Sequence, residues 1–381
     1  MELGWSHGNP VEIQFGSGKY RELGRLVTAA RVVLVTTPGT TRRGITGEIR
    51  SQFGKRLVEI YDRVSPNPEI SEIEQLREQL RGSGITGVVG VGGGSAMDTA
   101  KSLSFLLGTG AEGLDLAELL ETKRELPPIE PLDMTAVPTT HGTGGEVTPF
   151  ATLWDGEKKK KYSLSGDLIF PNRAVVDPEL TTSLPESVSI STALDALSQG
   201  FEALWNRNRT PLTGLFSVAA IDLIFTALPR VLADDRQLKI REELLRASLF
   251  SGLAISQTRT ALAHSISYPL TAHLGIPHGL ACSVTLPALW KFNRPATPEW
   301  FDELAGRLGV ESCPAVVEAL FELFEQVKLR RRVRCYLKEK GMLLKLVDEM
   351  YTPERAGNNL RGVERADLVK IIAETDKWLW G

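Results

Sequence analysis

Short apolar runs alternate with helix-like segments through the first half of the chain, and this alternation constrains the fold most strongly. The apolar runs occupy residues 11–15, 32–36, 57–64, 87–91 and 136–138. Strands that alternate with helices form parallel sheets, because each helix crosses back over the sheet and the next strand starts at the same end as the one before. The pattern therefore predicts a parallel α/β sheet in the N-terminal part.

Strand patterns mostly end after residues 174–178, and long segments with helical periodicity follow up to Trp378. The change near Pro185 predicts two domains, an α/β domain over residues 1–184 and an all-helical domain over residues 185–381. The chain of 381 residues is long enough for two such domains.

Composition excludes several classes of protein. The formal net charge of −3 gives no basic excess for nucleic acid or an anionic membrane. The cysteines Cys282, Cys313 and Cys335 are too few and too widely spaced for a disulfide framework, which indicates a reducing, cytoplasmic location. The most apolar helical stretch, residues 217–228, contains Asp222 and is predicted to be a core helix too short to span a membrane.

A glycine loop follows the apolar run at residues 87–91 and precedes a helical segment: Gly92-Gly93-Gly94-Ser95. Glycine lets the backbone approach a ligand closely, and a helix N-terminus offers free N–H groups to a phosphate. Asp98 lies in the first turn of the helix, and Lys101 follows. The alternative is a tight strand-to-helix turn with no ligand.

A second loop, residues 138–148, follows another strand and carries Thr139, Thr140 and Thr148 among its glycines. Loops at the carboxyl ends of parallel strands line the ligand crevice of an open α/β sheet. Two such loops favour a ligand with a diphosphate. Lys161 could add a positive charge, although a lysine in this charged run could equally be a solvated surface residue.

Four polar residues in the second half have the character of metal ligands. Asp195 and Gln199 are four residues apart on one expected helix face, and His264 and His278 follow in later segments. A carboxylate, a carboxamide and two imidazoles suit Fe(II) or Zn(II). A helix cap and hydrogen-bonded core histidines would explain the same residues without a metal.

Together these motifs resemble the iron-containing (group III) alcohol dehydrogenases. The resemblance rests on Gly92-Gly93-Gly94-Ser95-Ala96-Met97-Asp98-Thr99-Ala100-Lys101, Pro138-Thr139-Thr140, Glu146-Val147-Thr148, Val176-Asp177-Pro178-Glu179-Leu180-Thr181 and Ile276-Pro277-His278-Gly279-Leu280, which occur in family order. It implies an α/β dinucleotide-binding domain with a parallel sheet and an all-α C-terminal domain, the fold shared with dehydroquinate synthase. It also implies NADP or NAD, Fe(II) or Zn(II), and a homodimer.

The cofactor-binding positions expected from these motifs fall in the α/β domain. They are Thr37, Asn67, Gly93, Gly94, Ser95, Asp98, Thr139, Thr140, Thr148, Lys161 and Leu180. Thr37 stands where an acidic residue often holds the ribose of NAD, with Arg42 and Arg43 close behind. We therefore expect NADP(H) to be accepted, in preference to NAD(H); the alternative is that both arginines face solvent.

This chain departs from the family pattern around the metal. By position, the family's Asp and three His become Asp195, Gln199, His264 and His278, and we expect Gln199 at the edge of the site. A further family histidine becomes Tyr268, a glycine becomes Arg259 and an alanine becomes His141. This pattern resembles a subgroup that includes phosphonoacetaldehyde reductases of phosphonate biosynthesis.

The resulting hypothesis is metal-dependent, NAD(P)H-linked reduction of a small aldehyde to a primary alcohol. Arg259 would bind an anionic tail, with phosphonoacetaldehyde as the leading substrate and a short semialdehyde carboxylate as the second candidate. Tyr268, the ribose hydroxyls or a water chain would deliver the proton. The alternatives are a lyase resembling dehydroquinate synthase, and a dinucleotide sensor made inactive by Gln199.

Overall fold

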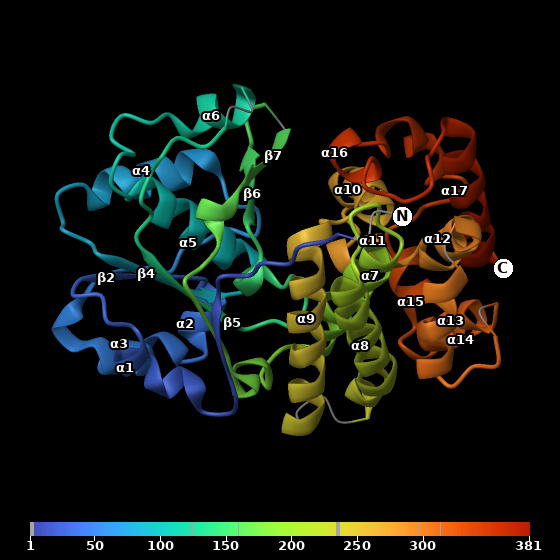
Figure 1. Cartoon of the computed structure of the whole chain (residues 1–381), viewed down its shortest axis with the longest axis horizontal. Coiled ribbons are helices and arrows are strands. Elements are labelled where there is room, and N and C mark those ends of the chain that lie inside the picture. Colours follow the sequence, from blue (N-terminus) through green and yellow to red (C-terminus); the bar gives the residue numbers. More distant parts are fainter. Residues whose placement is uncertain (1–3, 123–124, 159, 234–236, 297, 313) are drawn as a thin grey trace. The chain divides into compact units, whose positions relative to one another are not determined.

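The computed structural model describes residues 4–122, 125–158, 160–233, 237–296, 298–312 and 314–381. The chain forms two compact units (Figure 1). The α/β unit contains residues 9–140 and 144–183, and the helical unit contains residues 4–8, 141–143 and the chain from Leu184 onward. Cys313 lies outside the described residues.

A parallel sheet forms the centre of the α/β unit, as the alternating pattern predicts. Its strand order is β1-β8-β5-β4-β2-β3, and each neighbouring pair is parallel. The strands are β1 (Glu12–Phe15), β2 (Val32–Thr36), β3 (Leu57–Tyr61), β4 (Gly87–Gly92), β5 (Asp133–Pro138) and β8 (Arg173–Val176).

Alternating side chains bury both faces of this sheet. Val32 and Leu34 of β2 pack in one apolar cluster with residues of α3, whereas Val33 and Val35 pack on the opposite face with residues of α4 and α5. The helices of the unit are α1 (Leu23–Leu26), α2 (Pro38–Arg42), α3 (Ile45–Phe53), α4 (Ile70–Leu80), α5 (Gly94–Leu106) and α6 (Leu116–Thr122).

An antiparallel hairpin, β6 (Phe150–Asp155) and β7 (Lys160–Ser165), lies outside the main sheet and was not predicted. Ala151, Leu153, Tyr162 and Leu164 bury one side of it against an apolar cluster that includes residues of α4, α5 and α6. The alternation of apolar and polar residues in these strands was not recognised, because the lysine-rich turn between them has the composition of a solvated surface segment.

Helices alone make up the regular structure of the helical unit, within the residues described. They are α7 (Glu186–Leu204), α8 (Pro211–Ala227), α9 (Leu238–Thr258), α10 (Leu262–Leu274), α11 (His278–Ser283), α12 (Leu286–Asn293), α13 (Pro298–Arg307), α14 (Ala315–Gln326), α15 (Leu329–Arg334), α16 (Pro353–Ala356) and α17 (Arg365–Trp380). Their buried faces form one large apolar cluster.

Helix α8 is longer than the sequence pattern predicts. It continues as a 3-10 helix (Leu228–Leu232), and the stretch Pro211–Leu232 is long and apolar enough to cross a membrane by length and composition alone. The expectation that it is too short was therefore wrong. Helix α8 packs against α7 and α9, however, and Val218, Ile221 and Ile224 are buried in the apolar cluster of the helical unit.

Candidate metal centre and dinucleotide site

The sheet has a topological switch point between β2 and β4. From β2 the chain adds β3 on one side and then returns to add β4 and β5 on the other. Open α/β sheets bind ligands at the carboxyl ends of the strands at such a point. Thr37 directly follows β2, Gly93 follows β4 and Thr139 follows β5, so these predicted residues lie at the expected edge.

The glycine loop allows the helix after β4 to approach the strand closely. A Cβ atom on Gly92 would lie 2.6 Å from the Cβ of Ala96, so any larger residue would push α5 away from β4. A Cβ on Gly93 would lie 3.3 Å from the side chain of Thr140, and Thr139 N donates to the carbonyl of Gly92 at 2.8 Å. The two predicted loops are therefore adjacent.

Arg43 links further predicted cofactor residues to the same edge. Its guanidinium donates to the carbonyl of Leu180 at 3.1 Å and to Thr139 Oγ1 at 3.3 Å. Ser95 Oγ donates to the carbonyl of Pro66 at 2.6 Å, beside Asn67. Because Arg43 is already hydrogen-bonded within the loops, the expected preference for NADP(H) depends mainly on Arg42 and stays a prediction.

Two buried charged residues, Lys101 and Glu146, and the half-buried Asp98 lie beside this edge. Lys101 Nζ donates to the carbonyl of Thr148 at 2.7 Å, and burial lowers the pKa of Lys101 to about 8. Burial raises the pKa of Asp98 to about 6 and that of Glu146 to about 7. Lys161, on β7, is close enough to act on the charge of Asp98. The motif residues Asp98, Thr148 and Lys161 are thus brought together.

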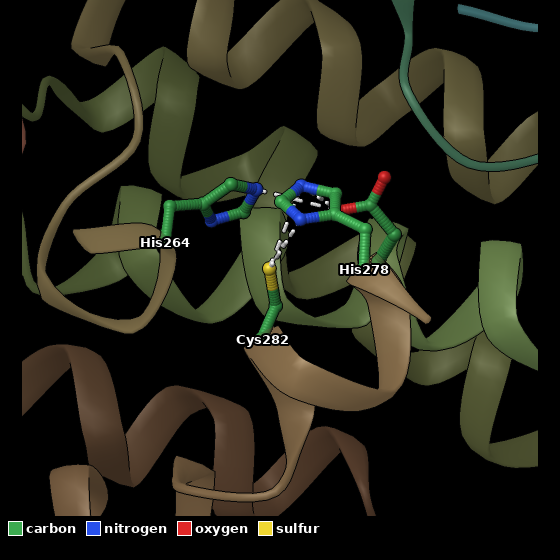
Figure 2. A group of neighbouring side chains, drawn as sticks. His264, His278 and Cys282 are labelled. Atoms are coloured by element: carbon green, nitrogen blue, oxygen red, sulfur yellow. Dashed lines mark hydrogen bonds and ion pairs between the residues drawn. The ribbon is translucent and has the colours of Figure 1, made fainter. Parts of the chain in front are cut away.

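The helical unit supplies the metal-binding candidates. Asp195, Gln199 and Glu202 share one face of α7, and all three are buried. His264 lies in the first turn of α10, whereas His278 and Cys282 lie one turn apart on α11. Figure 2 shows the side chains of His264, His278 and Cys282 converging.

The ligand atoms of Asp195, His264, His278 and Cys282 all lie within 4.8 Å of one another. His264 Nε2 is 3.3 Å from Asp195 Oδ1, and His278 Nε2 is 3.9 Å from the same oxygen. Cys282 Sγ is 3.6 Å from His278 Nε2. Bonds of about 2.0–2.3 Å to zinc place the ligand atoms of a tetrahedron about 3.3–3.8 Å apart, so the group fits one divalent cation.

The electrostatics of this group also favour a cation. Burial acts to lower the pKa of His264, but Cys282, Glu202 and Asp195 raise it well above its ordinary value. Burial acts to raise the pKa of the Cys282 thiol, but His264 and His278 lower it to about 7. The His278 side chain is 38% exposed, which leaves one side of the group open to a small molecule.

Glu202 fixes the orientation of His264 and was not predicted. Its carboxylate accepts from His264 Nδ1 at 2.5 Å and from the His264 backbone N–H at 3.0 Å. With Nδ1 held in this way, Nε2 faces Asp195, as in metal sites where a carboxylate orients a histidine ligand. The spacing of seven residues from Asp195, two helical turns, was the available signal. Gln199 Oε1 accepts from Ser251 Oγ at 3.0 Å, and its role as a ligand stays a prediction.

Gly279 allows α11 to lie against α7 beside Asp195. A Cβ atom at this position would lie 1.7 Å from the backbone oxygen of Ser191 and 3.1 Å from the backbone nitrogen of Asp195. No side chain fits there without a backbone shift. The glycine after His278 is therefore required by the close approach of two helices that carry ligands.

Of the two predicted catalytic residues, Tyr268 lies against the metal-binding group and Arg259 lies at the end of α9. The Tyr268 ring stacks on the His278 ring, with 6.4 Å between centroids. The guanidinium of Arg355, which was not predicted, lies 5.7 Å from the centroid of Tyr268. Arg259 is exposed and ends α9 with φ 62° and ψ 174°, a backbone conformation that favours glycine.

His141 is buried in the helical unit, away from solvent. Its ring nitrogens are 3.2 Å from Thr192 Oγ1 and 3.2 Å from a guanidinium nitrogen of Arg241. Burial, and then the charge of Arg241, lower the pKa of His141 from 6.5 to about 3. His141 is therefore neutral in the folded protein at neutral and mildly acidic pH.

This depressed pKa predicts a loss of stability in acid. Below pH 6.5 His141 is protonated in the unfolded chain, whereas in the folded chain it stays neutral down to about pH 3. The free energy of unfolding therefore decreases progressively as the pH falls through this range. The cost is about 2 kcal/mol at pH 5. His141→Gln should show a correspondingly smaller decrease between pH 7 and pH 5 in urea unfolding. Equal decreases in both proteins would contradict the assignment.

The fold and these two sites define a class: a dehydrogenase with a dinucleotide-binding α/β unit and a metal-binding helical unit. Residues 10–178 match the family described as "Iron-containing alcohol dehydrogenase". Residues 189–375 match "Fe-containing alcohol dehydrogenase family, C-terminal".

Relatives of this chain carry different substrate names. It is 33% identical to phosphonoacetaldehyde reductase from Streptomyces viridochromogenes, covering 92% of this chain and 91% of the relative. It is 28% identical to choline dehydrogenase from Bacillus subtilis, covering 92% and 90%. The structure of sulfoacetaldehyde reductase from Bifidobacterium kashiwanohense in complex with NAD+ superposes with a TM-score of 0.91 at 29% identity, covering 98% and 99%.

The chain belongs to the iron-containing alcohol dehydrogenase family. It is an enzyme, an NAD(P)-linked oxidoreductase acting on an alcohol or aldehyde, and the family's metal is iron. The predictions of family, fold class and cofactor class are confirmed.

Proposed function

We propose that this enzyme reduces a small aldehyde with an anionic tail to the primary alcohol, with phosphonoacetaldehyde going to 2-hydroxyethylphosphonate as the leading reaction. A short semialdehyde carboxylate is the second candidate substrate. The proposal includes the homodimer and the cytoplasmic location expected from the sequence, and a role in phosphonate biosynthesis.

The observation that carries the proposal is the position of Arg355 in the helical unit. Its guanidinium lies over the ring of Tyr268, which stacks on the candidate ligand His278. It also donates to Thr260 Oγ1 at 2.8 Å, which holds it beside α10. No carboxylate forms an ion pair with Arg355 among the residues that the structure describes. A guanidinium that has no anion and lies near the metal-binding group is suited to an anionic substrate tail.

Arg259 supports the same assignment independently. A non-glycine residue with φ 62° and ψ 174° is strained by about 1–3 kcal/mol, and such strain is typical of functional positions. The described part of the chain contains no ion-pair partner for Arg259, so the alternative of a structural ion pair gains no support. The backbone oxygen of Arg259 accepts from Asn206 Nδ2 at 3.1 Å, which helps to hold the conformation.

Each residue then has a defined task in the proposed reaction. Asp195, His264 and His278 would hold the metal ion, with Glu202 fixing the tautomer of His264. When bound, the metal supplies Lewis acidity at the carbonyl oxygen and the reduced nicotinamide supplies a hydride to the carbonyl carbon. Arg355 and Arg259 would bind the tail. Tyr268, whose ring stacks on His278, the ribose hydroxyls of the cofactor or a water chain would supply the proton to oxygen.

The names of the relatives do not decide the substrate. Phosphonoacetaldehyde and sulfoacetaldehyde are anions, whereas choline is a quaternary ammonium cation. Cations of that kind are bound by aromatic faces, and here a guanidinium already covers the face of Tyr268. This contact favours an anion.

The test is Arg355→Met and Arg259→Met, assayed with phosphonoacetaldehyde, a short semialdehyde, betaine aldehyde and a neutral aldehyde of matched size. Loss of one charge-assisted contact should lower kcat/KM about 10–100-fold for the anionic aldehydes only. Methionine retains the length and apolar character of the stem.

Arg365→Met is the matched control, because Arg365 is exposed and paired with Asp348. It should change kcat/KM for no substrate. Equal losses on charged and neutral aldehydes would assign both arginines to structure. A preference for betaine aldehyde in the unmodified enzyme would overturn the anionic substrate.

A further inference from the structure

Cys282 occupies a corner of the metal-binding group that the family pattern does not assign. It is fully buried on α11, one turn after His278. Its sulfur is 3.6 Å from His278 Nε2 and 3.7 Å from His278 Nδ1, and lies within 4.8 Å of the ligand atoms of Asp195 and His264. These separations are close to those of ligands on one tetrahedral ion.

Gln199, the residue expected in the position of the missing imidazole, is a poorer ligand. A carboxamide oxygen is neutral and hard, whereas a thiolate is charged and binds zinc or cobalt strongly. The oxygen of Gln199 also accepts a hydrogen bond from Ser251 at 3.0 Å. The chain therefore has a stronger donor than Gln199 within reach of the same ion.

We propose that Cys282 binds the metal as a thiolate and is the fourth protein ligand, with Asp195, His264 and His278. This inference rests on the metal site of the proposed function and adds the identity of the fourth ligand. On metal binding the S–H bond breaks, the sulfur electron pair forms the bond to the ion, and the proton leaves to solvent. No electron is transferred, so the step needs no oxidant.

Two consequences follow from a thiolate in this position. Asp195 and Cys282 together cancel the charge of a divalent ion, so the site binds the ion tightly but polarises a carbonyl less than a site with one anionic ligand. A soft ligand also shifts the preference from Fe(II) towards Zn(II) or Co(II), relative to a set of one carboxylate and three imidazoles. The alternative is that Cys282 is a small buried side chain that only packs beside His278.

The experiment uses the full-length protein, stripped of metal and titrated with Co(II). Thiolate bound to Co(II) should give a charge-transfer band in the near ultraviolet, and this band should be lost in Cys282→Ser. The same variant should bind Zn(II) at least about 100-fold more weakly, since loss of an outer partner alone costs about 10–100-fold. Gln199→Ala should keep the band and bind Zn(II) nearly as tightly as the unmodified protein.

Cys335→Ser is the matched control, because Cys335 is exposed on the surface; it should leave the band and the affinity unchanged. Circular dichroism of each metal-free variant checks that it is folded. Stoichiometric Co(II) binding that Asp195→Asn abolishes, but without a thiolate band, would overturn the role of Cys282 and leave the metal site intact. A protein that binds neither ion would overturn both.

Discussion

Replacing Asp195 with asparagine is expected to lower kcat/KM about 1,000-fold and to remove most of the bound metal. The carboxylate oxygen Oδ1 lies 3.3 Å from His264 Nε2 and 3.9 Å from His278 Nε2. It can therefore bind the same ion as both imidazoles. A carboxamide has the same shape without the charge. Losing about 4 kcal/mol of transition-state stabilisation corresponds to this change in rate.

Metal content by elemental analysis and NADPH affinity by fluorescence titration separate the causes. The affinity for NADPH should not change, because the predicted dinucleotide residues belong to the α/β unit. Asp302→Asn, at an exposed position on α13, should retain full activity and metal content. If Asp195→Asn retained full activity and metal content, the metal would have to bind elsewhere in the chain.

The second large effect is expected for Gly279→Ala. The new Cβ would lie 1.7 Å from the backbone oxygen of Ser191, so α7 and α11 must separate. We expect the metal-free protein to lose about 2–3 kcal/mol in urea unfolding, as in other overpacked sites. Metal affinity should also fall, because Asp195 and His278 lie on the two helices that move apart.

Gly306→Ala is the matched control. Gly306 lies within helix α13, and nothing lies within 4 Å of the position where its Cβ would be. Alanine should stabilise the protein there by up to about 1 kcal/mol, the difference in helix propensity. Similar unfolding free energies for the two alanine variants would show that the packing of α11 on α7 tolerates a side chain.

The sheet could be predicted because its strands are continuous apolar runs. The run at residues 32–36 coincides with β2, since both faces of that strand are buried. The hairpin of β6 and β7 was missed because only one side is buried and its turn is rich in lysine. Length was also misjudged for α8, whose apolar surface continues through a 3-10 helix.

The candidate site was predictable where its residues belong to family motifs, and not elsewhere. Cys282 and Glu202 stand at helical spacing from His278 and Asp195, but spacing alone does not separate a ligand from a packed side chain. Arg355 is far from Tyr268 in the sequence, and only the tertiary packing of α16 against α10 brings them together. The sequence contains no periodicity that encodes such a contact.

All four residues of the metal-binding group belong to the helical unit, on α7, α10 and α11. An ion bound there acts as a cross-link between three helices. It joins Asp195 to His264 across a long segment of the chain, and His264 to His278 across a short one. Because a preformed site does not exist in the unfolded chain, the free energy of metal binding adds to the stability of the folded state. The ion would thus stabilise the fold as well as take part in catalysis. In cells that lack the metal, less of the protein would be folded, in addition to the folded protein being inactive.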